Sequence, residues 1–172
     1  FYQAGVESVD DPQWQTKLLD PYGGPCLADL PFYPILGNHD YKGNPAAQIE
    51  YSVINPRWRF PNRFYTVKFG DLLRLVASDS QLSDFCFRPA YCSDQTDLYL
   101  AGHAHHLEHR RVEGCRMELV IAGGAGADLY EVKSEPESLY ARAVNGFAEL
   151  ELTATELVLR FYDVDGALLY EA

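Results

Sequence analysis

The sequence has few basic residues and no long apolar run. Lysine and arginine number 14 against 25 aspartates and glutamates, which gives a formal net charge of −11. A non-specific nucleic-acid binder needs a basic surface to displace phosphate counterions, so the composition argues against that class. Because no run of eighteen apolar residues occurs, we expect no membrane-spanning helix. A small phosphate-containing substrate remains compatible, since a bound metal ion can dominate the charge of a site.

Cysteine is also scarce, and its spacing does not match a zinc site. The four cysteines stand at positions 26, 86, 92 and 115, without the CxxC pairs of structural zinc centres. Cys86 and Cys92 close a short loop and could pair in an oxidising compartment, whereas free buried thiols are an equally good interpretation. Internal repeats are absent, and 47% hydrophobic residues in 172 positions predict one folded domain.

Periodicity and turn residues predict a few helices and many short strands. Asp10, Asp11 and Pro12 favour a helix within residues 7–19, and a second helix is expected over 46–54. The expected strands are 32–36, 64–70, 72–78, 97–103, the stretch from 117 into the glycines at 123, and three within 146–172. Residues 80–96 show no clear period. The pattern favours a layered α/β or α+β domain with its site at strand ends.

All five histidines lie in two clusters, and each cluster follows an expected strand. The first cluster reads Gly37-Asn38-His39-Asp40; turn chemistry explains every residue in it except His39. The second is AGHAHHLEH, in which His103 and His105 flank a single residue. Side chains two residues apart on an extended chain point the same way, so these two imidazoles would begin a metal site. The competing interpretation is a chance cluster of surface histidines.

Each residue type suggests a role. The amide oxygen of Asn38 can bind a hard cation. His39 could protonate a leaving group or hold a substrate oxyanion, with Asp40 fixing its tautomer and orientation. His106 and His109 are expected to point away from the metal. They would either form hydrogen bonds to the metal-binding residues or lie in solvent.

Gly-Asn-His-Asp followed by Gly-His-x-His resembles the calcineurin-like metallophosphoesterases. Longer stretches narrow this resemblance to the purple acid phosphatases, in particular the small tartrate-resistant type. They are FYQAGVESVDDPQWQ, GNHDYKGNPAAQIEYSVINPRWRFPNRFYTVKF, DLYLAGHAHHLEH, AGGAGA and the final strands, and they cover most of residues 1–79 and 97–172. The resemblance implies an α/β (α+β) fold, a β-sandwich flanked by helices. It would form a single metallophosphoesterase domain over 1–172, apparently incomplete at an N-terminal strand and near 80–96.

The resemblance also implies a ligand set and an activity. Tyr2 and His105 would bind ferric iron, while Asn38 and His103 would bind a divalent iron, zinc or manganese ion. His39 would face the phosphate and assist the leaving group. The implied function is an exported acid phosphatase, secreted or periplasmic, that hydrolyses phosphate monoesters with a dinuclear centre and a metal-bound hydroxide.

The sequence departs from the family pattern at several ligand positions. The bridging aspartate and a further aspartate would precede Phe1, and the sequence does not contain them. The family's Gly-His-x-Pro loop has no histidine counterpart within residues 80–96, and Ala104 stands where the family usually has aspartate. Without the bridging carboxylate, which holds two metals at the required separation, the chain as written would bind metal poorly.

Three hypotheses follow. In the first, the sequence is a partial record of a complete phosphatase. In the second, it is a catalytically degenerate homologue that acts as a binding or assembly module. The third is another metal-dependent reaction, such as phosphodiester or nucleotide hydrolysis, because one fold supports several chemistries. The sequence leaves the oligomeric state open, although an incomplete sheet edge would invite pairing with another chain.

Overall fold

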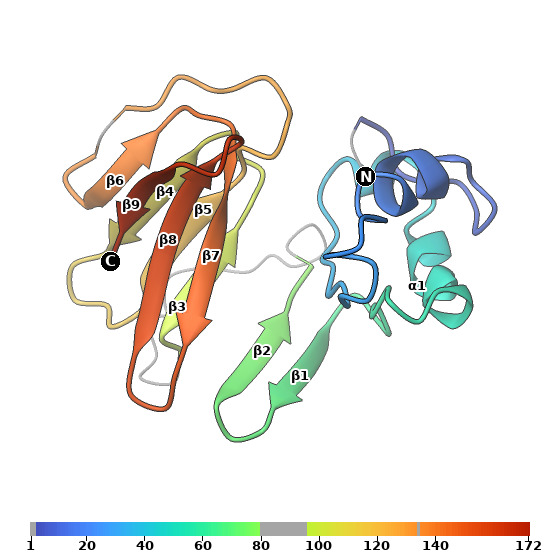
Figure 1. Cartoon of the computed structure of the whole chain (residues 1–172), viewed down its shortest axis with the longest axis horizontal. Coiled ribbons are helices and arrows are strands. Elements are labelled where there is room, and N and C mark those ends of the chain that lie inside the picture. Colours follow the sequence, from blue (N-terminus) through green and yellow to red (C-terminus); the bar gives the residue numbers. More distant parts are fainter. Residues whose placement is uncertain (1–2, 80–95, 134) are drawn as a thin grey trace. The chain divides into compact units, whose positions relative to one another are not determined.

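The computed structural model describes residues 3–79, 96–133 and 135–172. The chain divides into two compact units, Phe1–Phe85 and Cys86–Ala172, and each is described by itself (Figure 1). The first unit contains a π-helical turn (Gln15–Leu19), a 3₁₀ turn (Asp40–Lys42), helix α1 (Pro45–Ile54) and strands β1 (Tyr65–Phe69) and β2 (Leu73–Ala77). The second contains β3 (Leu98–Ala101), β4 (Leu107–Arg111), β5 (Glu118–Ala122), β6 (Ser138–Arg142), β7 (Gly146–Leu152), β8 (Leu157–Asp163) and β9 (Leu168–Glu171).

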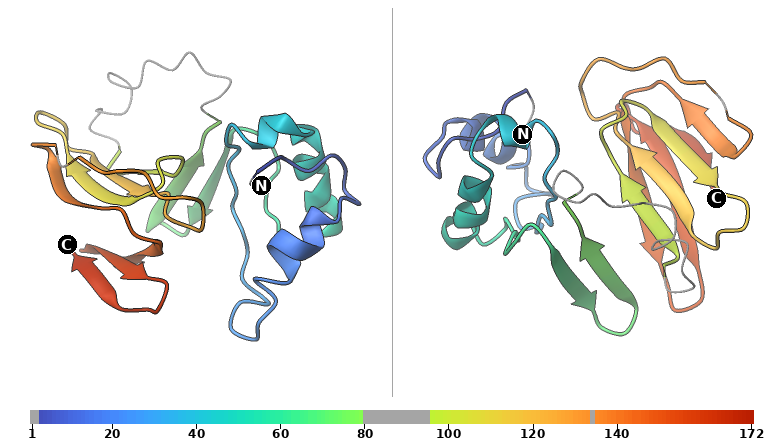
Figure 2. Two further views of the ribbon diagram at one scale, coloured as in Figure 1. Left: turned by 90° about the horizontal axis from the view of Figure 1, so that it is seen from above. Right: turned by 180° about the vertical axis from the view of Figure 1, so that it is seen from behind.

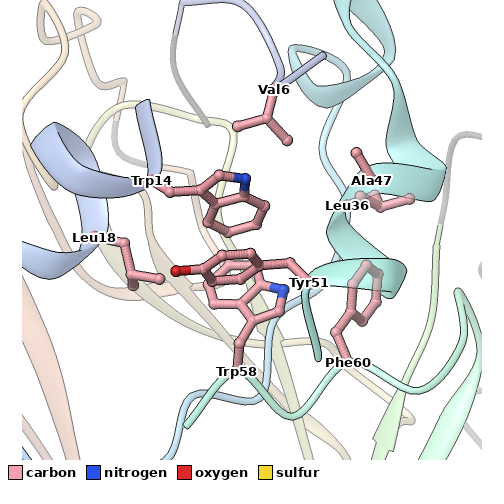
Figure 3. Packing of buried hydrophobic residues seen from close by; sticks show 8 residues of the cluster. All are labelled: Val6, Trp14, Leu18, Leu36, Ala47, Tyr51, Trp58 and Phe60. Atoms are coloured by element: carbon pink, nitrogen blue, oxygen red, sulfur yellow. The ribbon is translucent and has the colours of Figure 1, made fainter. Parts of the chain in front are cut away.

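Aromatic rings form the core of the first unit. Trp14 stacks on Tyr51 with ring centroids 3.6 Å apart, and Trp58 meets Trp14 edge-on at 5.2 Å. Figure 3 shows these rings among the buried residues of the cluster, with Phe60 beside them. The indole of Trp58 donates to the carbonyl of Gln48 at 2.9 Å, so this buried polar group is satisfied. The cluster fastens α1 to the segments on either side of it.

Helix α1 begins where the sequence predicts. The Asn44 side chain accepts a hydrogen bond from the Ala46 N–H at 3.1 Å, and Pro45 occupies the first turn. The helix expected within 7–19 is shorter and reduces to the turn Gln15–Leu19. Asp11 instead accepts hydrogen bonds from the N–H groups of Gln13 at 2.9 Å and Glu7 at 2.8 Å, so the preceding residues form a turn.

The strand expected over 32–36 is wrong except at its first residue. Phe32 forms an isolated parallel bridge with Trp58, and its N–H donates to the Arg57 carbonyl at 2.7 Å. Pro34 has no N–H to continue such a ladder. The hairpin expected around Gly70 is confirmed, because β1 and β2 pair antiparallel and Gly70 has φ +57°.

The second unit contains two sheets that pack face to face. In the first sheet the strand order is β3-β5-β4-β6, in which only β3 and β5 pair in parallel; in the second it is β7-β8-β9, all antiparallel. Leu107 and Val120 from one sheet and Leu159 and Phe161 from the other form the buried core. Figure 2 shows the sheets of this unit as two layers. The remaining expected strands are confirmed, whereas β4 and β6 had not been predicted.

The class is α+β, as expected, with mixed sheets and few helices. Across the residues that the structure describes, no helix has both the length and the apolar character needed to cross a membrane.

Gly123 allows the loop before β4 to approach β5 closely. A Cβ atom at this position would lie 1.8 Å from the Ala104 carbonyl oxygen, and the Gly123 N–H donates to the His106 carbonyl at 3.0 Å. The glycine stretch after β5 is therefore a packing requirement of the histidine loop.

We expect Gly123→Ala to lower the free energy of unfolding by about 1–3 kcal/mol or more, because backbone must shift to admit the methyl group. Gly102→Ala is the matched control, since a Cβ there would meet no atom within 4 Å. It should stay within about 0.5 kcal/mol of wild type in urea unfolding. Equal effects of the two substitutions would contradict the close approach.

Candidate functional site

Hydrogen bonds to the Asp40 carboxylate stabilise the Gly37–Asp40 loop of the first unit. Asp40 is buried and accepts hydrogen bonds from the Gly37 N–H at 2.8 Å and from the Gln48 side-chain amide at 2.6 Å. Gln48 lies on α1, so the helix supports the loop through this carboxylate. Asn38 and His39 are partly exposed on the other side of the turn. The hydrogen bonds of Asp40 thus fix the backbone that carries His39.

The ring of His39 is oriented by a backbone carbonyl. Its Nδ1 lies 2.6 Å from the carbonyl oxygen of Gln3, which can only accept, and 3.1 Å from the Lys42 ammonium, which can only donate. The shorter of the two contacts, to Gln3, requires the proton on Nδ1. Nε2 then carries the lone pair of the neutral ring. The sequence assigned ring orientation to Asp40, and the structure places Gln3 at the ring itself.

The segment that supplies Gln3 fits against the loop because of two glycines. A Cβ on Gly5 would lie 2.3 Å from the Asp40 carbonyl oxygen, and one on Gly43 would lie 2.6 Å from the Gly5 carbonyl carbon. The Asn44 N–H also donates to the Val6 carbonyl at 2.8 Å. Larger side chains at either glycine would push the two segments apart.

A further buried carboxylate lies near this loop. Asp79 follows β2, is fully buried and accepts a hydrogen bond from the Tyr41 hydroxyl. Sequence reasoning did not single out Asp79, although an aspartate directly after a strand is the same signal that identified the histidine clusters. Burial, together with the hydrogen bond to Asp79, raises the pKa of Tyr41 to about 12.

In the second unit His105 is oriented in the same way as His39. Its Nδ1 lies 2.6 Å from the Asp128 carbonyl oxygen, so Nδ1 donates and Nε2 carries the lone pair in the neutral ring. The ring stacks on Tyr130 with centroids 4.2 Å apart and planes 14° apart. An imidazole whose second nitrogen donates to a backbone carbonyl is the usual arrangement of a metal-binding histidine.

His103 does not adopt the extended conformation that the sequence suggested. Strand β3 ends at Ala101, and His103 has φ +70°, the one positive φ among non-glycine residues that the structure describes. The side-by-side argument for His103 and His105 therefore fails, because it assumed an extended chain. Left-handed backbone at a non-glycine residue is costly and is concentrated at functional sites.

The other two histidines are packed inside the second unit. His106 Nε2 lies 3.0 Å from the buried Glu108 carboxylate. His109 is 3% exposed, pairs with Glu118 through Nε2 and lies 3.1 Å from the Tyr170 hydroxyl through Nδ1. The solvated interpretation is wrong for His109, and His106 instead supports the loop next to His105.

The predicted ligands divide between the two units. Tyr2 lies outside the described residues, Asn38 lies in the first unit, and His103 and His105 lie in the second. Within the described ranges, no three side chains of histidine, cysteine, aspartate or glutamate gather closely enough to hold a metal ion. Even a structural or catalytic zinc needs at least three protein ligands. The orientation of His105 fits a metal ligand, but the described residues alone do not complete a metal centre.

The cysteines are partly described. Cys115 is disulfide-bonded, and Cys26 is free and exposed. The pairing considered for Cys86 and Cys92 lies outside the described residues.

Two of the tyrosines with raised pKa values, Tyr41 and Tyr65, predict a loss of stability in alkali. Burial and the neighbouring Tyr33 raise the pKa of Tyr65 to about 12, as burial and Asp79 do for Tyr41. Because a tyrosine in the unfolded chain ionises near pH 10, the unfolded state loses protons first. The free energy of unfolding should fall between about pH 10 and about pH 12. Tyr41→Phe with Tyr65→Phe should flatten this decline, and an unchanged slope would contradict the assignment.

The hydrogen bonds at His39 and His105 predict their tautomers. Both neutral rings should carry the proton on Nδ1, whereas free histidine favours Nε2. Long-range ¹H–¹⁵N correlation spectra distinguish the two forms, and His39→Gln and His105→Gln variants would assign the signals. An Nε2–H tautomer at either residue would rule out the hydrogen bond to the carbonyl of Gln3 or Asp128.

Comparisons with known proteins agree with the motifs. The chain is 44% identical over 69 residues to rabbit (Oryctolagus cuniculus) tartrate-resistant acid phosphatase type 5, a match covering 40% of this chain and 21% of that protein. It therefore spans well under two thirds of that relative. Over 242 residues it is 21% identical to purple acid phosphatase 4 of Arabidopsis thaliana, covering 99% and 70%. That alignment is longer than the chain, so parts of the relative have no counterpart in this sequence. No family model matches.

The structure of GAP50, the anchor in the inner membrane complex of Plasmodium, is also similar. It superposes with a TM-score of 0.76 at 19% identity and covers 100% of this chain and 75% of the GAP50 chain. At this identity the likeness concerns the fold alone. The resemblance is thus confirmed: the chain is related in sequence to the purple acid phosphatases, and its α+β fold is consistent with a calcineurin-like phosphoesterase domain.

Proposed function

We propose that this chain belongs to an acid phosphatase that hydrolyses phosphate monoesters at a dinuclear metal centre. One observation carries the proposal: the imidazoles of His39 and His105 are each held through Nδ1 by a backbone carbonyl 2.6 Å away. In both rings Nδ1 is therefore the donor, and Nε2 is the atom that would bind a metal ion or, when protonated, act on a leaving group. The sequence similarity to tartrate-resistant acid phosphatases supports a monoester substrate.

The proposed ligands are those that the resemblance implies. Tyr2 and His105 would bind ferric iron, and Asn38 and His103 a divalent iron, zinc or manganese ion. When bound, two metal ions would activate the nucleophile and neutralise charge on the phosphate. Aspartate and histidine ligands of the family lack counterparts here, so the proposal requires protein segments beyond this sequence, in a single domain that includes 1–172.

His39 would act on the leaving group. The Gln3 carbonyl fixes the ring through Nδ1–H, so in the imidazolium form Nε2 would hold the proton that passes to the departing alkoxide. Asp40 would keep the loop in place through its hydrogen bonds to Gly37 and Gln48. We also propose that the protein is exported, because Cys115 is disulfide-bonded and disulfides persist in oxidising compartments.

A second candidate is a non-catalytic assembly module. The similarity to GAP50, described as an anchor in a membrane complex, favours it, as does the lack of a three-ligand cluster within the described ranges. In that case both histidine loops would retain their geometry without chemistry, and the protein would bind a partner through its surface.

Substitution of His39 separates the two candidates. We expect His39→Asn to reduce kcat/KM on phenyl phosphate by about 10²–10⁴-fold. The loss on p-nitrophenyl phosphate should be smaller, because p-nitrophenolate leaves with little need of a proton. Lys68→Met, at an exposed position on β1, is the control and should leave both rates unchanged.

Three results would contradict the proposal. Equal losses on both esters would remove the leaving-group role of His39. Absence of hydrolysis by the full-length wild-type protein would favour the assembly module instead. Faster hydrolysis of bis(p-nitrophenyl) phosphate than of p-nitrophenyl phosphate would assign a diesterase.

A further inference from the structure

The basic residues of the chain are unevenly distributed. Residues 55–77, which end with the β1–β2 hairpin, contain five of the 14 lysines and arginines but only one of the 25 acidic residues. The five basic residues are Arg57, Arg59, Arg63, Lys68 and Arg74. Within the described residues, none of the five forms an ion pair with a carboxylate. A positively charged segment therefore stands in a protein with a net charge of −11.

Two of these cations lie opposite each other on the hairpin. Lys68 on β1 and Arg74 on β2 are register partners, and both are exposed. Like charges at directly opposite positions destabilise a pair of strands, and a sheet of two strands is itself only marginally stable. Figures 1 and 2 show the hairpin projecting from the rest of the first unit. An anionic partner at this position would reduce the repulsion between the two side chains.

The tip of the hairpin is apolar. Phe69, Leu72 and Leu73 lie at the turn and are 42%, 48% and 39% exposed. The Leu72 N–H donates to the Phe69 carbonyl at 3.3 Å, which closes the turn. Lys68 and Arg74 directly flank this stretch, so apolar surface and positive charge adjoin at one end of the hairpin. That combination matches the surface of a membrane, where acyl chains lie beneath anionic headgroups.

We infer that the β1–β2 hairpin docks on the surface of an anionic lipid bilayer. Leu72 and Leu73 would enter the boundary between headgroups and acyl chains, and Lys68 and Arg74 would contact the anionic headgroups. A soluble polyanion would satisfy the two cations but leave the apolar tip in water, so the combination favours a bilayer. The inference goes beyond the proposed function, because the hairpin contains none of the proposed ligands or catalytic residues.

Vesicle flotation with the full-length protein tests the inference. Vesicles of phosphatidylcholine with about one quarter phosphatidylserine should bind the protein on the order of tenfold more strongly than vesicles of phosphatidylcholine alone. The preference should weaken as salt is raised, because the headgroup charges are screened.

Charge substitutions assign the contact to the hairpin. Lys68→Met and Arg74→Met should each weaken binding to the anionic vesicles by about fivefold. Asp71→Asn should strengthen binding by a similar factor, because Asp71 is the acidic residue of the turn and is repelled by the headgroups. Arg142→Met, at an exposed position on β6, changes the net charge as Lys68→Met does and should leave binding unchanged.

The apolar tip is tested separately. Leu72→Ser should weaken binding to the same vesicles by about three- to tenfold, since the membrane then buries less apolar surface. Leu72 is chosen in place of Phe69, whose ring packs edge-on against Tyr33 at 5.6 Å and so also anchors the hairpin. Val53→Ser is the matched control, because Val53 on α1 is 90% exposed, and it should bind as wild type does. Circular dichroism should show each variant folded as wild type.

Equal binding of the two kinds of vesicle by wild type would overturn the inference. Binding that survives both Lys68→Met and Arg74→Met would overturn it as well. If the charge substitutions weaken binding, Leu72→Ser does not, and soluble polyglutamate competes with the vesicles, the partner is a soluble polyanion and the bilayer is overturned. None of these results alters the test of the phosphatase proposal, which uses soluble esters without lipid.

Discussion

The hydrogen bond from an imidazole Nδ1 to a backbone carbonyl is the interaction on which the candidate site depends. It occurs at His39 with Gln3 and at His105 with Asp128, in two units of the chain. Each carbonyl fixes the tautomer and the plane of a ring, and so determines which nitrogen can act. Without it an exposed imidazole would sample several rotamers and both tautomers, and a catalytic or ligand role would require ordering at each encounter.

Much of the surrounding structure serves to bring these carbonyls close. Gly5 and Gly43 let the N-terminal segment approach the His39 loop, and Gly123 lets β5 approach the loop that carries His105. The glycines that looked like loosely defined turns in the sequence are thus positions where backbone meets backbone. Buried carboxylates also stabilise the two loops. Asp40 accepts a hydrogen bond from Gln48 under the first loop, and Glu108 pairs with His106 in the second.

The sequence predicted those parts of the fold in which side-chain identity carries the signal. Asn44 and Pro45 mark the start of α1, and Gly70 marks the β1–β2 hairpin. It failed at 32–36, where strand-forming residues found a partner only at Phe32. Both motif loops were recognised from residue type, but their ring partners were not. A carbonyl 36 or 23 residues away leaves no trace in the sequence, because every residue has one.

The two histidine loops have a defined geometry, whereas a metal centre needs more ligands than the described residues supply. The most direct test of the proposed dinuclear centre is the metal content of the purified full-length protein, measured by mass spectrometry together with its visible absorption spectrum. We expect a pair of metal ions per chain, one of them ferric, with a tyrosinate-to-iron band that is lost in Tyr2→Phe. A protein that binds no metal under saturating iron and zinc would contradict the proposed centre, and the geometry of the two loops would then belong to an assembly module.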